Sequence, residues 1–228
     1  TWAAPTSNGG SDITGYVATA TLSTNVFTCT APSTATSCLI KGLTNGSKYS
    51  IKVSASNGAG AGPESSVAGT TTPRGIPNAP TLVSVDPQNQ SLVVKWRAIT
   101  TSADNNGSAI SKYIAKAMPS GQTCQVDGFT TAGNGSTVAN TTCTITGLTN
   151  GAIQSVTVTA VNEAGTSSAS NAISTTPRSA PGAPVGVKLT PLNGGVSISW
   201  NAPIDSGGTP ITRYTGSASP AGTAGSVS

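Results

Sequence analysis

The sequence of 228 residues contains no histidine, and only 8% of its residues carry a charged side chain. Nucleophilic triads and most general acid/base sites depend on histidine, so its absence argues against such chemistry. It also removes a common zinc ligand, and the four cysteines show neither metal spacing nor a Cys-x-x-Cys redox motif. We therefore predict that the chain is not an enzyme and uses no cofactor.

Carboxylates are few as well, and paired carboxylates would be the remaining route to acid/base catalysis. The segment from Asp104 to Gly107 gathers side-chain oxygens that suit Ca²⁺, but it has one carboxylate and no acidic partner nearby in the sequence. We interpret it as a plain loop and predict no metal site. The seven acids occur singly, mostly where turns are expected: Asp12, Glu64, Asp86, Asp104, Asp127, Glu163 and Asp205.

Basic residues exceed acidic ones, 11 against 7, and give a formal net charge of +4. They are spread along the chain with no basic run and no interleaved aromatic residues, so we predict no nucleic-acid partner. No stretch approaches the roughly 20 apolar residues that span a bilayer, and we predict no membrane insertion. The sequence shows no pattern typical of a signal peptide.

Strong helix formers such as Leu, Glu, Lys and Gln are scarce, whereas Thr, Ser, Gly, Ala and Val are abundant. Apolar side chains alternate with polar ones: Tyr49, Ile51, Val53 and Ala55 do so, as do Val156, Val158 and Ala160. This period of two is typical of strands that bury one face, and no segment sustains a period of 3.6. The sequence predicts an all-β fold with essentially no helix.

Internal repeats organise the chain. Residues 42–46, Gly-Leu-Thr-Asn-Gly, recur at 147–151, and residues 71–74, Thr-Thr-Pro-Arg, recur at 175–178. The two offsets, 105 and 104 residues, agree closely. A period near 100 residues suits an independently folding β-sandwich and is too long for a solenoid. Three Trp residues recur at intervals of 94 and 104 residues, and each is followed by a Tyr: Trp2, Trp96 and Trp200, then Tyr16, Tyr113 and Tyr214.

These motifs resemble the fibronectin type III domain, in the Thr- and Gly-rich form common in very large bacterial surface proteins. The resemblance rests on the Trp, a Gly-rich loop, an Ile-x-x-Tyr strand, the Gly-Leu-Thr-Asn-Gly turn and the closing Thr-Thr-Pro-Arg. It implies tandem immunoglobulin-like β-sandwiches with structural core residues at set positions. In family terms the Trp residues end strand B, the Tyr residues above lie on strand C, and Leu43 and Leu148 precede strand F. Tyr49 holds the strand F tyrosine position, where the second copy has Gln154.

The four cysteines fall as two pairs, Cys29 with Cys38 and Cys124 with Cys143, one pair in each repeat. We predict an intra-repeat disulfide in each case in preference to free thiols, with the first Cys of each pair in an irregular stretch after strand C. Disulfides persist in oxidising compartments, so we expect an extracellular or cell-surface protein.

Two Pro-rich linkers, residues 74–80 and 178–184, divide the chain into three parts. We predict a partial domain at 1–73 that lacks strand A and most of strand B, a complete domain at 81–177, and a partial domain at 185–228 with strands A to C only. Counted with the Pro that precedes it, each linker has three prolines in eight residues, at 73–80 and 177–184, which leaves it little slack. The partial domains indicate either a window from a longer array or a polymer in which residues 179–200 complete the first domain of another copy.

We expect a structural repeat protein that forms a stalk, filament or surface-layer fibre. Its partners would be other copies of the same repeats. The alternative is an adhesin or a carbohydrate-surface spacer with cell-surface glycans as partners, which would require an exposed aromatic or charged cluster. Most aromatic residues are assigned to cores, so Phe129 is the main candidate for such binding.

Overall fold

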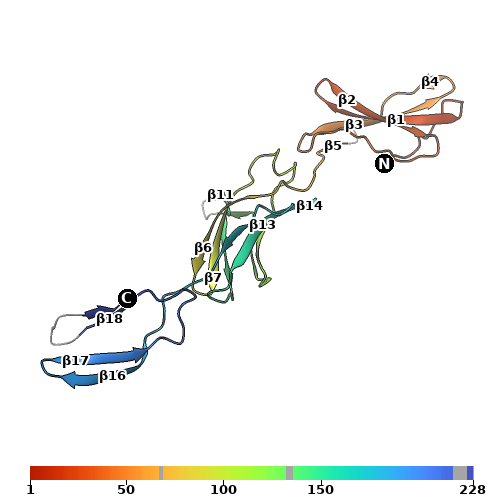
Figure 1. The fold of residues 1–228 in the computed structure, drawn as a ribbon. Coiled ribbons are helices and arrows are strands. Elements are labelled where there is room, and N and C mark those ends of the chain that lie inside the picture. Colours follow the sequence, from red (N-terminus) through yellow and green to blue (C-terminus); the bar gives the residue numbers. More distant parts are fainter. Residues whose placement is uncertain (67–68, 132–135, 218–224, 228) are drawn as a thin grey trace. The chain divides into compact units, whose positions relative to one another are not determined.

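The computed structural model describes residues 1–66, 69–131, 136–217 and 225–227 (Figure 1). These residues form nineteen β-strands and no helix, which confirms the all-β prediction. The chain forms two compact units. The first comprises Thr1–Asn78, Ile99–Ile110 and Val161–Ser167, and the second comprises Ala79–Ala98, Ser111–Ala160 and Ser168–Ser228.

The first repeat has one well-formed sheet. Alternation along its central strand buries Tyr16, Ala18 and Ala20 on one face, as a period of two requires. The neighbouring strand places Ala55 opposite Tyr16 and Val53 opposite Ala18. The sheet order is β2-β1-β3-β4, formed by β1 (Ile13–Leu22), β2 (Asn25–Pro32), β3 (Tyr49–Asn57) and β4 (Gly60–Ala61), with β5 (Thr70–Thr71) paired to β3.

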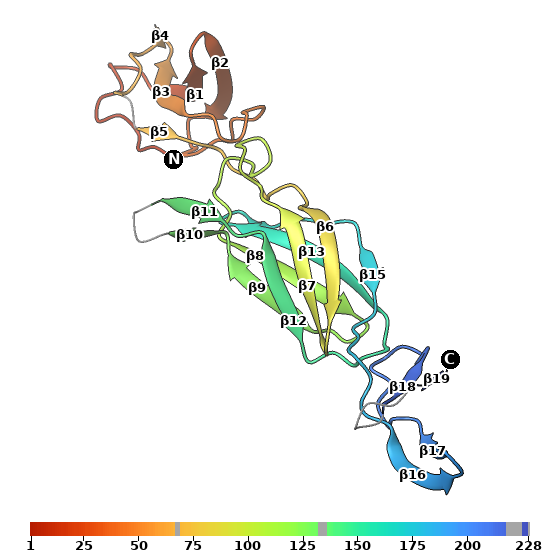
Figure 2. The ribbon, with the colours of Figure 1, turned by 90° about the vertical axis from the view of Figure 1, so that its left-hand side faces the viewer.

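The middle repeat is a two-sheet sandwich (Figure 2). One sheet, in the order β12-β7-β6, contains β6 (Thr81–Gln88), β7 (Ser91–Arg97) and β12 (Thr142–Thr146). The other, in the order β14-β13-β8-β9, contains β8 (Lys112–Met118), β9 (Thr123–Asp127), β13 (Gln154–Asn162) and β14 (Gly165–Thr166), and β15 (Ile173–Thr175) pairs with β13. A separate hairpin consists of β10 (Phe129–Thr131) and β11 (Thr137–Ala139).

The core of this sandwich comes from inward-facing residues of both sheets. Leu92, Val94 and Trp96 on β7 are at most 2% exposed, and they face a second set on β8 and β13 that is equally buried. The rings of Trp96 and Tyr113, from opposite sheets, lie 5.3 Å apart between centroids. Other buried members include Ala115, Ala117, Ile145, Leu148, Val156, Val158 and Ala160.

The same Trp–Tyr contact recurs in each repeat. Trp2 and Tyr16 lie 5.3 Å apart between ring centroids, and Trp200 and Tyr214 lie 5.4 Å apart. Aromatic rings at this distance, tilted to one another, contribute beyond the area they bury. The spacing of Trp and Tyr in the sequence therefore corresponds to one packing unit that is used three times.

The third repeat consists of two hairpins within the described residues, β16 (Val185–Leu192) with β17 (Gly195–Asn201) and β18 (Tyr214–Gly216) with β19 (Gly225–Val227). The strand β17 alternates like β7, but Val196 is 48% exposed, whereas its counterpart Leu92 is fully buried. The sequence predicts strands A to C only, with Tyr214 on strand C. The structure pairs the Tyr214 strand, β18, with a further strand, β19.

A buried polar side chain closes the turn before strand F in the first two repeats, but by different contacts. In the first, the hydroxyl of Tyr49, only 1% exposed, accepts a hydrogen bond from the backbone N–H of Thr44 at 3.0 Å. In the second, Gln154, 3% exposed, accepts one from the N–H of Ser120 at 3.3 Å. Gln154 Nε2 also donates to the carbonyl of Ala152 at 3.5 Å, so the substitution keeps a contact with the preceding turn and adds one with a neighbouring loop.

Replacing Tyr49 with Phe should lower the free energy of unfolding of the first repeat by about 0.5–1.5 kcal/mol, because the N–H of Thr44 loses its acceptor while the ring stays packed. Urea unfolding of the variant and the native chain, followed by hydrogen exchange of the β3 amides, measures this. An unchanged exchange rate in β3 would show that the hydroxyl contributes nothing.

Candidate functional site

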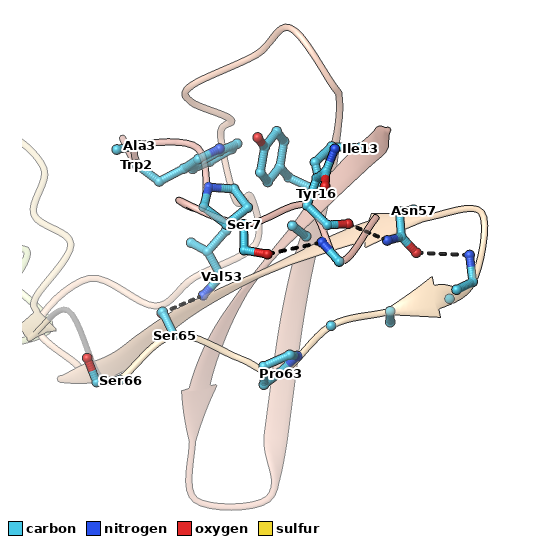
Figure 3. A pocket seen from close by; sticks show the side chains of 18 of the residues that line it. Trp2, Ala3, Ser7, Ile13, Tyr16, Val53, Asn57, Pro63, Ser65 and Ser66 are labelled. Carbon is cyan, nitrogen blue, oxygen red and sulfur yellow. Dashed lines mark hydrogen bonds between the residues drawn. The ribbon is translucent and has the colours of Figure 1, made fainter. Parts of the chain in front are cut away.

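A hollow of about 740 Å³ in the first repeat opens beside Trp2 and Tyr16 (Figure 3). Its lining is mostly apolar and includes Val53 and Pro63. The polar side chain of Asn57 is already engaged, because its amide donates to the carbonyl of Asn8 and its oxygen accepts from the N–H of Ala59. None of the described residues lining the hollow is acidic or basic.

The hollow corresponds to a sandwich core. Trp2 and Tyr16 match Trp96 and Tyr113 in the repeat alignment, and Val53 matches Val158. In the middle repeat these three residues are at most 2% exposed between the two sheets. The hollow is therefore a core face that is less covered in the first repeat, and its chemistry is that of packing.

In the candidate Ca²⁺ loop, each oxygen of the Asp104 carboxylate accepts a hydrogen bond from a protein donor. The hydroxyl of Thr101 donates to Asp104 Oδ2 at 2.6 Å, and Asn78 Nδ2 donates to Asp104 Oδ1 at 3.1 Å. The hydrogen bond from Thr101, then that from Asn78, lowers the pKa of Asp104. Within the part of the chain that the structure describes, no group of three or more His, Cys, Asp and Glu residues could hold a metal ion.

We predict that Asp104 in this loop makes the free energy of unfolding depend on pH in acid. The folded-state pKa of Asp104 lies below its ordinary value of 3.8, so its stabilisation is present above that pH and is lost as the pH falls through the folded-state pKa. Asp104→Asn should therefore unfold with a shallower dependence on pH below about 4 than the native chain. Urea midpoints at pH 7 and below pH 3, at low salt, provide the comparison; equal slopes would refute it.

Three exposed ion pairs join acidic side chains to basic ones. Lys52 pairs with Glu64 and Lys95 with Asp86, both at 2.8 Å, and Arg74 pairs with Glu163. Exposed pairs of this kind contribute at most about 1 kcal/mol each. They engage three of the seven carboxylates with neighbouring cations.

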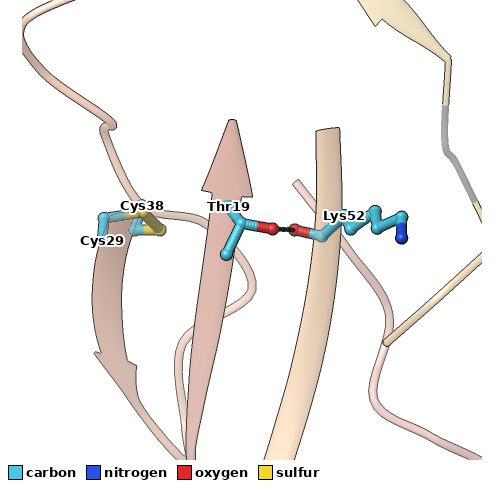
Figure 4. Close-up of a disulfide and its surroundings, with 4 residues drawn as sticks. All are labelled: Thr19, Cys29, Cys38 and Lys52. Atoms are coloured by element: carbon cyan, nitrogen blue, oxygen red, sulfur yellow. Dashed lines mark hydrogen bonds between the residues drawn. A yellow bond between two sulfur atoms is a disulfide. The ribbon is translucent and has the colours of Figure 1, made fainter. Parts of the chain in front are cut away.

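All four cysteines form disulfides, one in each of the first two repeats. Cys29 on β2 joins Cys38 in the segment that leads toward β3 (Figure 4). Cys124 on β9 joins Cys143 on β12. Since β9 and β12 are edge strands of different sheets, this second disulfide ties the two sheets of the middle sandwich together.

The expectation of an irregular stretch around the first Cys of each pair is wrong. Cys29 lies opposite Ala18 in the β1–β2 pairing, and Cys124 lies opposite Ala115 in the β8–β9 pairing. The surrounding Thr and Val residues favour extended backbone, so both segments join their sheets as edge strands.

Phe129, the candidate for ligand binding, lies on β10 and is 38% exposed. It is paired with Ala139 across the β10–β11 hairpin. On the same hairpin Val138 is 62% exposed, but it lies opposite Thr130 and therefore on the other face from Phe129. Single exposed apolar side chains of this kind are ordinary in soluble proteins.

The repeats match a known family. The sequence profile of the Fibronectin type III domain matches residues 1–71 and 78–176. The chain belongs to the fibronectin type III family. Its fold is also similar to the crystal structure of chicken CNTN1 FN1-FN3 domains, with 19% identity and a TM-score of 0.40 over 75% of this chain and 58% of that chain.

Fibronectin type III domains are typically non-catalytic, extracellular structural or adhesion modules, and disulfides such as these are typical of extracellular proteins. In the described residues, no helix is long and apolar enough to cross a membrane.

One recurring polar residue had no predicted role. Asn57 and Asn162 end the strand F of their repeats, and the motif Val-x-Ala-x-Asn contains both. Asn162 is 4% exposed, and its amide donates to the carbonyls of Gly75 at 2.8 Å and Asn105 at 2.9 Å. Its oxygen accepts from the N–H of Ala164 at 2.9 Å. The repetition of Asn was visible in the sequence, but its partners are distant in the chain.

Proposed function

We propose that this chain is a non-catalytic segment of a large bacterial surface or secreted protein, and that its repeats form a stalk, filament or surface-layer fibre. The observation that carries the proposal is the repetition of one fibronectin type III unit, with a disulfide in each of the first two copies. The repeats share the same core contacts, the first two each contain a disulfide, and their carboxylates are dispersed. These features suit a structural role in which the number of repeats sets the length of a stalk or fibre.

Within this proposal the domains are residues 1–73, 81–177 and 185–228, joined by the linkers 74–80 and 178–184. The partners are other copies of the same repeats. Charge supports contact between similar repeats, because a sparsely charged chain with a formal net charge of +4 brings little repulsion to each unit.

Labelling of the native host tests this function. An antibody against the chain should label intact cells or culture medium, and the native protein should show no reactive thiol until a reductant is added. Labelling only after the cells are opened, together with thiols that react without reductant, would overturn the extracellular role.

The second candidate is an adhesin or a glycan-binding spacer, and the partial exposure of Phe129 favours it. If it is correct, Phe129→Ala should weaken binding of the chain to cells or a glycan array by about tenfold, as loss of an aromatic contact at an interface does. Val26→Ala is the matched control, because Val26 is 60% exposed on the first repeat. Equal binding by the native chain and Phe129→Ala would count against this candidate.

A further inference from the structure

The repeated Asn-Gly turn contacts the Pro that immediately precedes the following linker in both repeats. In the first compact unit, the N–H of Gly46 donates to the carbonyl of Pro73 at 2.8 Å. In the second unit, the N–H of Gly151 donates to the carbonyl of Pro177 at 2.9 Å. The sequence repeats both partners, Gly-Leu-Thr-Asn-Gly and Thr-Thr-Pro-Arg, so the same backbone contact is made twice.

Each linker also pairs with a loop that follows it. The N–H groups of Gly75 and Asn78 donate to the carbonyls of Asn106 and Asp104, at 2.9 and 2.8 Å. These four residues belong to the first unit. The second unit repeats this register, because Ser179 and Gly182 donate to Gly207 and Asp205, both at 2.9 Å. In both places the donors are three residues apart and the acceptors two.

The loop glycines have no room for a side chain. A Cβ on Gly107 would lie 2.2 Å from the backbone nitrogen of Gly46 and 2.8 Å from the carbonyl oxygen of Pro73. A Cβ on Gly208 would lie 2.4 Å from the backbone nitrogen of Gly151. These are contacts with backbone, which cannot rotate away as a side chain end can.

The loop around Gly10 in the first repeat distinguishes the steric clash with backbone from the effect of a positive φ. Gly10 aligns with Gly208, and its φ of 82° is close to the 80° and 86° of Gly107 and Gly208. A Cβ on Gly10 would meet no atom within 4 Å. A left-handed φ by itself favours glycine at all three positions, so only the close approach of backbone distinguishes Gly107 and Gly208 from Gly10.

Side chains reinforce the first of the two contacts. Asn45 Nδ2 donates to Asn106 Oδ1 at 3.5 Å, and the buried amide of Asn162 donates to the carbonyls on both sides of the contact, Gly75 and Asn105. Arg74 of the linker pairs with Glu163. All of these residues lie within the first compact unit.

We propose that these elements form a joint used twice in the chain: by backbone hydrogen bonds, the Asn-Gly turn of one repeat holds the Pro just before the linker and the glycine loop of the next repeat holds the linker itself. The partner that fits the glycine loop is the Asn-Gly turn of a preceding repeat of the same kind. The joint restricts bending at the linker and sets the stiffness of the array. This joint adds to the structural role proposed above. Only its biological purpose, the stiffness of an extracellular array, rests on that proposed function.

Hydrogen exchange of the full chain tests the joint. In the native chain, the amides of Gly75 and Asn78 should exchange at least about tenfold more slowly than in an unstructured peptide, because both are donors in the joint. Gly107→Ala should remove most of this protection in residues 74–80 and leave residues 178–184 unchanged. Gly208→Ala should do the reverse.

Gly10→Ala is the matched control, because it adds the same methyl at a similar φ where no atom is near. It should leave both linkers protected. Equal loss of protection in Gly10→Ala and Gly107→Ala, or no loss in Gly107→Ala, would overturn the joint. Faster exchange of the β7 and β8 amides in Gly107→Ala would mean that the variant destabilises the whole middle repeat. In that case the exchange of the linker amides in the native chain is the test: slow exchange supports the joint and fast exchange overturns it. Unprotected linkers would leave the extracellular role untouched.

Discussion

Trp96→Ala lowers the free energy of unfolding of the middle sandwich by about 3–5 kcal/mol, the range observed when a large aromatic residue is removed from a core. Trp96 is 2% exposed and packs against Tyr113 of the opposite sheet. Its removal leaves a cavity between two sheets that are held in place by strand pairing, so the surroundings cannot collapse fully. Urea unfolding followed by hydrogen exchange of the β8 and β13 amides measures the loss.

Trp96→Phe provides the control for this variant. The indole Nε1 of Trp96 is buried without a hydrogen-bond partner in the described structure, so Phe removes an unsatisfied donor while it keeps an aromatic ring against Tyr113. Trp96→Phe should therefore lose clearly less stability than Trp96→Ala. A loss below about 1 kcal/mol in Trp96→Ala would contradict the assignment of Trp96 to the core.

The second large effect is that of the disulfide between the two sheets of the middle sandwich. Replacing both Cys124 and Cys143 with Ala should lower the free energy of unfolding of this repeat by about 3 kcal/mol, because the bridge closes a loop of 19 residues in the unfolded chain. A reductant should destabilise the native middle repeat by a similar amount and leave the double variant unchanged.

The first repeat supplies the matched control. Replacing Cys29 and Cys38 with Ala opens a loop of 9 residues there and should leave exchange in β8 and β13 as it is in the native chain. If the Cys124/Cys143 variant unfolded at the same urea concentration as the native chain, the disulfide would have no stabilising role.

The strands that contribute to the core could be predicted because apolar and polar residues alternate along them in the sequence. The alternation through Val156, Val158 and Ala160 predicts a strand, and β13 (Gln154–Asn162) contains all three as fully buried residues. The Trp and Tyr spacing likewise predicts equivalent positions in each repeat, and each pair of rings is in contact.

The edge strands were harder to predict, because the turn that forms the β1–β2 hairpin lacks the usual turn chemistry. Ser23 has a φ of 54°, in a region that favours Gly or Asn, and no Gly or Pro marks the turn between Leu22 and Asn25. The segment around Cys29 therefore resembled a loop in sequence, whereas pairing with β1 makes it a strand.

The contacts around the linkers could not be predicted from local pattern at all. Gly107 looked like an ordinary loop glycine, and its requirement comes from the backbone of Gly46, 61 residues earlier in the chain. Asn162 and Gly75 are 87 residues apart. Such pairs depend on tertiary structure, and a single sequence carries the residue types but no information on their proximity.

Electron microscopy of the native material would show whether this chain is part of an extracellular array of fibronectin type III repeats, as proposed. We expect beaded strands in which the bead spacing is regular and an antibody against the chain labels successive positions. Isolated compact particles, each bearing a single antibody and showing no repeated beads, would contradict it.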